Sequence, residues 1–224
     1  MTDGRDDLDP RAPLFFLSYG SVKPLANPAA EQTDLNRNAI RLFHDLSVHV
    51  VELLGLPAGT DPGFMDQTFG GGEPWRAEIL RAVGTCQVFI PLVSPLLIRS
   101  EWCAKEWHAF TRRNTTRLDG GTAQTRQTSV IPVIWTPSEL ANWPPVIRAI
   151  QVFAPNGLPD AAVLGRYRQE GLNGLLIMER EADYRTVVWK LARRVVQVLG
   201  EYRVRPRIPD KIDQLVNVFS RETL

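Results

Sequence analysis

Cysteine, histidine and net charge are all scarce in this chain of 224 residues, and each scarcity excludes a class of protein. The two cysteines, Cys86 and Cys103, cannot form the disulfide framework of a small secreted domain, so we expect two free thiols used in packing. The three histidines show no ligand spacing with the cysteines, and we expect no metal centre. A net charge of +1 creates no field that would attract nucleic acid or an acidic membrane, so neither is an expected partner.

Long apolar runs are also absent. No stretch is long and apolar enough to span a bilayer. Residues 1–13 are acidic and broken by prolines, and they do not resemble a signal peptide. We therefore expect a disordered leader at 1–13 and a cytoplasmic location. The apolar fraction of 44% is ordinary for a globular protein with a real core, and the length suits one domain with extensions.

Short apolar runs alternate with segments of helical periodicity along the rest of the chain. The runs predict buried strands at 14–18, 63–66, 88–93, 130–135 and 172–178. Apolar residues at helical spacing predict helices over 35–53, 75–86, 102–113 and 184–198, with a short helix at 210–219. Residues 114–128 and most of 136–170 are expected to be irregular.

Strands that alternate with helices predict an α/β fold in which helices cover both faces of a parallel sheet. Five strands suggest the flavodoxin-like order 2-1-3-4-5. Pro91 and Pro132 fit central strands poorly, because each lacks the N–H that the ladder needs, so we expect bulges or strand ends there. The domain is predicted to span 14–200, and 201–224 to form a linker with the short C-terminal helix.

Polar residues follow the predicted strands where an open sheet binds ligands, beyond the carboxyl ends at the switch point. Ser18 and Tyr19 end the first strand, Asp66 ends the second and Ser94 follows the third. Their convergence would make a binding site. The alternative, that these are ordinary residues at the starts of loops, stays open.

Glu106 is the sharpest candidate for chemistry. On a helix it falls in the middle of an apolar arc that contains Trp102, Cys103, Trp107 and Phe110. A carboxylate on a core-facing stripe is costly unless it has a partner or lines a cavity. It would then belong to a site, to a buried ion pair, or to a first helical turn where the dipole favours it. Cys103 has no histidine placed to activate it, which favours a structural thiol over a nucleophile.

Four sequence motifs, taken in order, resemble those of Toll/interleukin receptor (TIR) domains. They are FFLSYG at 15–20, GFMD at 63–66, VFIPLVSP at 88–95 and SEWCAKEW at 100–107. The resemblance covers roughly residues 14–200. The Ser-x-Trp-Cys-x-x-Glu pattern is similar to TIR domains that cleave NAD+. LPAG at 56–59, PGFMD at 62–66 and CAKEW at 103–107 resemble most the bacterial TIR-like proteins of the FxsC type, which are linked with modified ribosomal peptides.

The resemblance implies an NAD+ hydrolase or cyclase in which Glu106 is the catalytic carboxylate. It implies self-association through TIR–TIR contacts, and no cofactor, with NAD+ as the substrate. The segment from Asp66 to Trp75 would be the BB loop, which gates the site and mediates assembly; its inner residues are Gln67, Thr68, Phe69, Gly70, Gly71, Gly72, Glu73 and Pro74. The residues expected to border the substrate are Phe16, Ser18, Tyr19, Asp66, Ser94 and Trp102.

The sequence departs from the family pattern in the polar insertion at 21–33 and in the proline-rich stretch before the predicted fifth strand. Two functions therefore stay open. One is an NAD+-consuming enzyme, of the kind found in bacterial immunity. The other is a non-catalytic interaction module that scaffolds a peptide-modifying or signalling complex.

Overall fold

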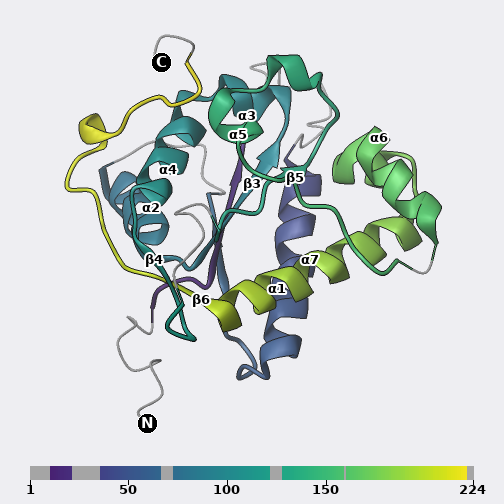
Figure 1. The fold of residues 1–224 in the computed structure, drawn as a ribbon, viewed down its shortest axis with the longest axis horizontal. Helices are drawn as coiled ribbons and strands as arrows, with labels where there is room; N and C mark the ends of the chain where they lie inside the picture. Colours follow the sequence, from purple (N-terminus) through teal and green to yellow (C-terminus); the bar gives the residue numbers. More distant parts are fainter. Residues whose placement is uncertain (1–10, 22–35, 67–72, 122–127, 159, 221–224) are drawn as a thin grey trace, which may run out of the picture.

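A computed structural model describes residues 11–21, 36–66, 73–121, 128–158 and 160–220. A parallel sheet of four strands lies at its centre, in the order β2-β1-β3-β5 (Figure 1). The strands are β1 (Phe15–Tyr19), β2 (Gly63–Met65), β3 (Val88–Val93) and β5 (Val133–Ile134). Every residue of β1 and β3 is buried, as expected of strands covered on both faces. The predicted α/β class is confirmed.

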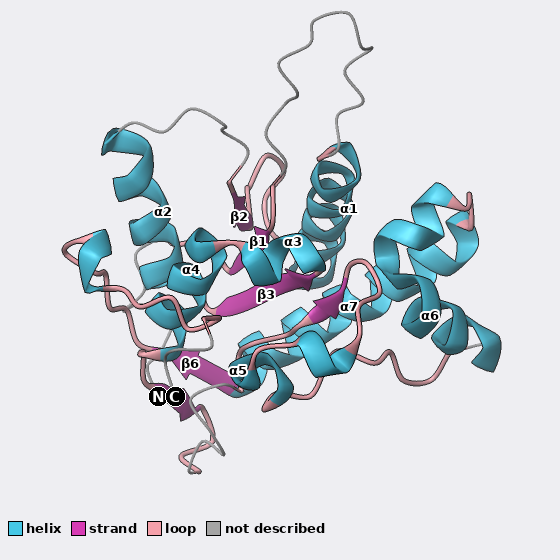
Figure 2. Ribbon diagram, turned by 90° about the horizontal axis from the view of Figure 1, so that it is seen from above, coloured by secondary structure: helices cyan, strands magenta, loops and turns pink. Residues whose placement is uncertain are grey.

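Helices cover both faces of this sheet (Figure 2). The bounds of these helices agree closely with those predicted from the apolar periodicity. Gly55 ends the first helix, with a left-handed φ of 61°. One face carries α1 (Arg37–Leu54), α6 (Ala161–Ile177) and α7 (Glu181–Glu201); the other carries α2 (Glu73–Thr85) and α4 (Glu101–Thr111). The short helices are α3 (Pro95–Arg99) and α5 (Pro145–Arg148), with a 3-10 turn at Leu140–Asn142.

Side chains of β1 alternate between two core clusters, and this alternation positions the site. Phe15, Leu17 and Tyr19 pack with α1, α6 and α7, whereas Phe16 packs with α2 and α4. Successive strand residues point to opposite faces, so Ser18 shares the face of Phe16. Ser18 is thereby directed towards α4.

The predicted fifth strand at 172–178 is wrong, because these residues belong to α6. Leu172 and Leu175 are buried at a spacing of three, and Leu176 packs against the same core, which is the period of a helix and not of a strand. Gly171, with a φ of 68°, interrupts α6 just before this run. A short apolar run does not distinguish a strand from a buried helix by composition alone.

Proline limits pairing at the β5 edge of the sheet. The N–H of Phe89 and the carbonyl of Val93 form hydrogen bonds on the side of β3 that faces β5. Backbone groups of alternate residues face the same side, so the backbone of Pro91 also faces β5. Proline has no N–H to donate, and pairing is interrupted there, between Val130 and Val133. Beyond β5, Phe153 donates a backbone hydrogen bond of 2.8 Å to Pro132. An extended segment lies beside β5, where the predicted order would place a fifth strand.

The C-terminal part of the chain packs against the α4 face. β6 (Tyr202–Val204) pairs antiparallel with β4 (Thr115–Arg117), in a region predicted to be irregular. The predicted helix at 210–219 is reduced to a 3-10 turn at Ile212–Gln214. Leu215 and Phe219 are nevertheless buried, so the segment packs against the domain. Among the described residues, no helix has both the length and the apolar character required to cross a membrane.

Candidate functional site

The start of α4 sets the geometry of the site. Ser100 caps the helix, because its hydroxyl accepts a hydrogen bond of 3.2 Å from the N–H of Cys103. Trp102 and Glu106 then lie four residues apart on one side of α4, one turn above the other. The cap thus fixes where the carboxylate of Glu106 meets the sheet.

Glu106 contacts the end of β1. The hydroxyl of Ser18 donates a hydrogen bond of 2.5 Å to the Glu106 carboxylate, and both residues are buried. Within the described part of the chain, Glu106 forms no ion pair. It also lies in the second turn of α4, beyond the first-turn position. The geometry therefore favours the interpretation of Glu106 as part of a binding or catalytic site, over a buried ion pair or a carboxylate stabilised by the helix dipole.

Burial raises the pKa of the Glu106 carboxyl to about 8, because the charged form loses its hydration. The Ser18 hydrogen bond opposes this shift by stabilising the anion, and the nearby charge of Asp66 adds to it. A carboxyl whose pKa is strongly perturbed at the carboxyl ends of parallel strands is a candidate functional group on physical grounds.

Two tryptophans form an aromatic wall beside Glu106. The rings of Trp75 and Trp102 stack with centroids 5.2 Å apart and planes inclined by 19°. The indole N–H of Trp75 donates a hydrogen bond of 2.8 Å to Asp66, at the end of β2. A continuous series of contacts thus joins the ends of β1 and β2 to the first turns of α2 and α4.

The indole N–H of Trp102 interacts with the Glu106 carboxyl only weakly, without the geometry of a full hydrogen bond to any described residue. It is buried, and it lies near enough to Glu106 to lower the pKa of that carboxyl, yet it makes no hydrogen bond in the described part of the chain. Buried donors are almost always paired in native proteins. An unpaired donor beside a buried carboxylate fits a site whose ligand supplies the missing acceptor.

The remaining expected residues occupy different positions. Phe16 is fully buried between Phe64 and Phe89, with centroid separations of 5.4 and 5.7 Å, on the side of the sheet that α2 and α4 cover. The side chain of Tyr19 packs on the opposite face of the sheet. Ser94 caps α3, since its hydroxyl accepts a hydrogen bond of 3.2 Å from the N–H of Leu97.

Only the two ends of the expected BB loop fall within the described residues. Asp66 follows β2, and Glu73 and Pro74 begin α2. The positions at 67–72 are those of Gln67, Thr68, Phe69, Gly70, Gly71 and Gly72.

Both cysteines are buried and free, as predicted. The thiol of Cys103 donates to the carbonyl of Tyr19 across 3.4 Å. Burial raises the pKa of Cys103 to about 12, so the thiol stays protonated at neutral pH and is not a nucleophile. Burial likewise raises the pKa of Cys86 to about 12. Cys103 packs α4 against β1 beside the Ser18–Glu106 pair.

Gly20 and Trp75 were not among the residues expected to border the substrate, but both shape this region. A Cβ on Gly20 would lie 2.4 Å from the backbone of Leu96 and Leu97, so only glycine lets α3 approach the end of β1 this closely. The Tyr-Gly pair directly after a buried strand was the available signal. For Trp75, the signal was a tryptophan in the first turn of a helix, matching Trp102 in the first turn of α4.

These features define an α/β domain of flavodoxin-like build with a buried carboxylate at the carboxyl ends of its strands. A family model described as "TIR domain" matches residues 48–157. The matched range includes Asp66, Trp75, Trp102 and Glu106. No curated protein and no solved structure matches the chain.

Proposed function

We propose that this protein is an NAD+ glycohydrolase that releases nicotinamide, with Glu106 as the catalytic carboxylate. The observation that carries the proposal is a buried carboxylate without an ion-pair partner in the described part of the chain, next to an unpaired buried donor. A carboxylate kept only for stability would be expected to have a cation beside it. TIR domains include enzymes that cleave NAD+, so the family match is compatible with this activity.

One carboxylate suffices for this reaction. Glycosidases usually need a second carboxyl group as an acid, because their leaving group must be protonated. The nicotinamide of NAD+ is already cationic and departs as a neutral molecule, with the electron pair of the broken C–N bond. The ribose carbon becomes electron-poor, and a preorganised anion that faces it lowers the barrier. Attack by water gives ADP-ribose and releases a proton, whereas attack from within the substrate gives a cyclic product.

The neighbours of Glu106 have distinct proposed roles. Ser18 holds the carboxylate in one orientation through its hydrogen bond. Trp102 offers its unpaired N–H to a substrate oxygen, and with Trp75 it offers an aromatic wall. Asp66 fixes Trp75 and adds negative charge that favours the cationic nicotinamide ring of the substrate. Phe16 supports the site from below.

The raised pKa of Glu106 gives a reason for regulation. A carboxyl with a pKa of about 8 is mostly neutral at pH 7, and a neutral carboxyl does not stabilise a cation. We propose that self-association, or binding of the substrate's cationic nicotinamide ring, shifts the Glu106 carboxyl towards its anionic form. Activity should then rise more than linearly with protein concentration.

The raised pKa of Glu106 also supports a second candidate function, a non-catalytic interaction module such as an FxsC-type or signalling scaffold. A neutral Glu106 would be tolerated by a domain that only self-associates. The deciding experiment incubates concentrated protein with NAD+ and follows nicotinamide release by chromatography over a dilution series. Glu106→Gln protein is the control. Association without release of nicotinamide at any concentration would support the scaffold and contradict the enzyme.

A further inference from the structure

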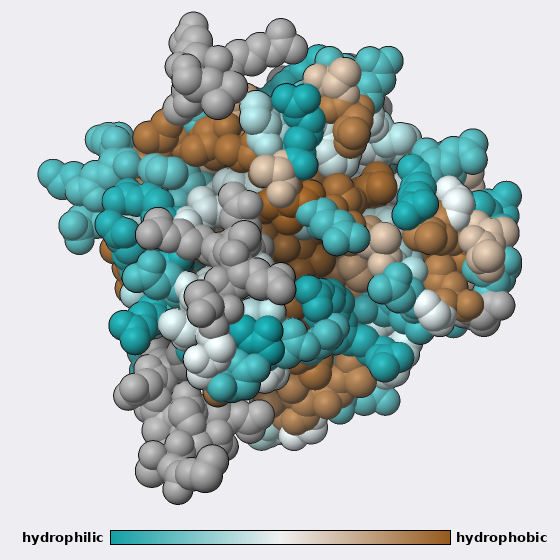
Figure 3. Space-filling view, in the orientation of Figure 1, coloured by the Kyte–Doolittle hydropathy of each residue, from teal (hydrophilic) through white to brown (hydrophobic). Residues whose placement is uncertain are grey.

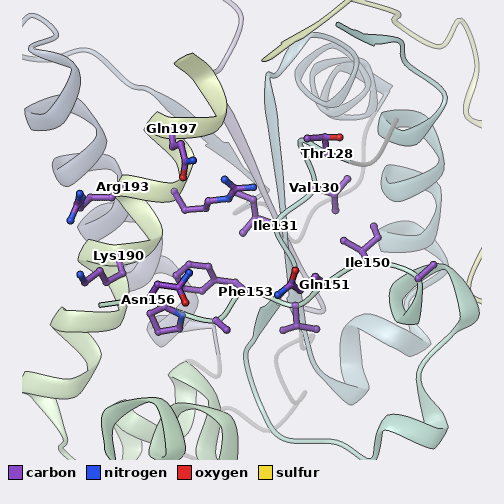
Figure 4. A pocket seen from close by; sticks show the side chains of 15 residues that line it. Thr128, Val130, Ile131, Ile150, Gln151, Phe153, Asn156, Lys190, Arg193 and Gln197 are labelled. Carbon is purple, nitrogen blue, oxygen red and sulfur yellow. The ribbon is translucent and has the colours of Figure 1, made fainter. Parts of the chain in front are cut away.

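A cavity of about 760 Å³ lies at the β5 edge of the sheet, away from Glu106 (Figure 4). One wall is α7, which contributes Lys190, Arg193 and Gln197, and the facing wall includes Ile150 and Gln151. α7 and α4 cover opposite faces of the sheet, so this cavity is separate from the site described above. Its volume is in the range of small-molecule sites, roughly 300–1,000 Å³.

The incomplete edge of the sheet explains the cavity. Residues 149–156 run where a fifth strand would close the sheet, and the backbone bond of Phe153 to Pro132 is the contact that holds them there. Pro132 and Pro155 have no N–H to extend a ladder. On the face shown in Figure 3, apolar surface is hollowed beside α7.

The charge of the cavity has one sign. Lys190, Arg193 and Arg194 line it, and the described residues of its lining include neither aspartate nor glutamate. Lys190 donates a hydrogen bond of 2.7 Å to the carbonyl of Gly157. Arg193 and Arg194 form no ion pair or hydrogen bond within the described part of the chain. Two neighbouring arginines are thus available to an anionic ligand.

Two other arginines that contact α7 are each paired with a carboxylate of that helix. Arg185 contacts Glu181 at 2.9 Å, and Arg166 contacts Asp183 at 2.6 Å. Arg193 and Arg194, which line the cavity, have no such carboxylate partner among the described residues. A planar guanidinium suits phosphate, because its donors match two phosphate oxygens at once.

The other side of the cavity is apolar. Val130, Ile150 and Val152 line it, with the amides of Gln151 and Asn156 close by. A ligand complementary to both walls carries a flat, weakly polar part and an anionic group. We propose that the cavity binds an organic phosphate of nucleotide size, with its phosphates at Arg193 and Arg194. This proposal does not depend on catalysis by Glu106.

The test is calorimetric titration of the full chain with ADP at low salt. The Arg193→Gln/Arg194→Gln double variant should bind ADP at least about tenfold more weakly, because a hydrogen bond to a charged group contributes roughly a factor of ten or more. Adenosine and inorganic pyrophosphate should each bind more weakly than ADP. Added salt should weaken binding of ADP to the wild type.

Two controls locate the site. Arg168→Gln removes an exposed arginine of α6 that does not line the cavity, and it should leave ADP affinity unchanged. Glu106→Gln should also bind ADP normally, whether or not it cleaves NAD+. The melting temperature of the double variant without ligand should equal that of the wild type, because neither arginine has a described partner to lose.

Three results would overturn the proposal. The first is wild-type ADP affinity in the double variant. The second is equal weakening by Arg168→Gln, which would indicate general charge attraction only. The third is loss of binding in Glu106→Gln, which would place ADP at the other site. Absence of ADP binding up to about 5 mM, weaker than any useful site, would also refute it.

Discussion

The carboxylate of Glu106 accepts a 2.5 Å hydrogen bond from the hydroxyl of Ser18, which lies 88 residues earlier in the chain. Both groups are buried, so the bond acts in a medium of low polarity, where it is stronger than in water. It joins the middle of α4 to the end of β1 and controls how readily Glu106 ionises.

Replacing Glu106 by glutamine should abolish most of the activity without unfolding the protein. Glutamine keeps the size and one acceptor oxygen for Ser18 but loses the charge that would face the ribose cation. Loss of one preorganised electrostatic group lowers turnover on the order of 10²–10³. Nicotinamide release and melting temperature should be measured on the same preparation. Full activity in this variant would exclude Glu106 as the catalytic carboxylate.

Because the pKa of Glu106 is raised, we expect the stability of the protein to fall with increasing pH while its activity rises. The folded protein holds the Glu106 proton up to about pH 8, whereas the unfolded chain releases it near the ordinary value of 4.5. The contribution of Glu106 to stability is therefore complete below 4.5 and is lost as the pH rises to about 8. The value of kcat/KM should rise over the same upper range, because the anion is the active form.

Thermal melts of wild type and Glu106→Gln from pH 5 to 9 check the stability half of this prediction. The glutamine of the variant cannot ionise, so the melting temperature of the variant should increase relative to that of the wild type as the pH rises. A difference in melting temperature that stays constant across this range would show that Glu106 is ionised throughout.

Removing the Ser18 hydroxyl should shift the pH profile upwards. Ser18→Ala deletes the hydrogen bond that lowers the pKa of Glu106, so more alkali is needed to ionise it. A hydrogen bond to a charged group contributes about 1.5–3 kcal/mol, which corresponds to a rise of about one to two pH units in the midpoint of kcat/KM.

Ser94→Ala is the matched control for Ser18. It also removes a buried serine hydroxyl at a strand end, but this one caps α3 and does not contact Glu106. It should lower stability by about 1 kcal/mol and leave the pH midpoint in place. Equal shifts from both variants would mean that the profile reports stability and not the ionisation of Glu106.

The sequence predicted the parts of this arrangement that depend on local pattern. Helical spacing located α1 and α7, and the apolar arc of α4 identified Glu106 as unusual. The predicted order of strands placed Ser18 at the carboxyl ends of the strands, the edge where a ligand site was expected. The 2.5 Å contact depends on the relative placement of β1 and α4, which no local pattern specifies.

Other features depend on competition between distant segments. Residues 172–178 have the composition of a strand, but their burial follows a helical period, and residues 149–156 lie beside β5 instead. The stacking of Trp75 on Trp102 requires α2 and α4 to lie side by side, which follows from the topology but not from either helix alone. Tertiary packing decided these cases.

The last prediction concerns the C-terminal segment as a support for α4. The ring of Phe219 packs against Trp107, which follows Glu106, with centroids 5.8 Å apart, and Phe219 is only 8% exposed. Phe219→Ala should destabilise the protein by about 2–3 kcal/mol, at or below the low end for a buried phenylalanine, because a segment whose regular structure is one 3-10 turn can relax into the cavity. Val216→Ala, in the same segment but 42% exposed, should cost less than about 0.5 kcal/mol. Urea unfolding of both variants compares them directly. If deletion of residues 206–224 leaves stability and association unchanged, and the two point variants unfold alike, the segment is a linker and α4 keeps its position without it.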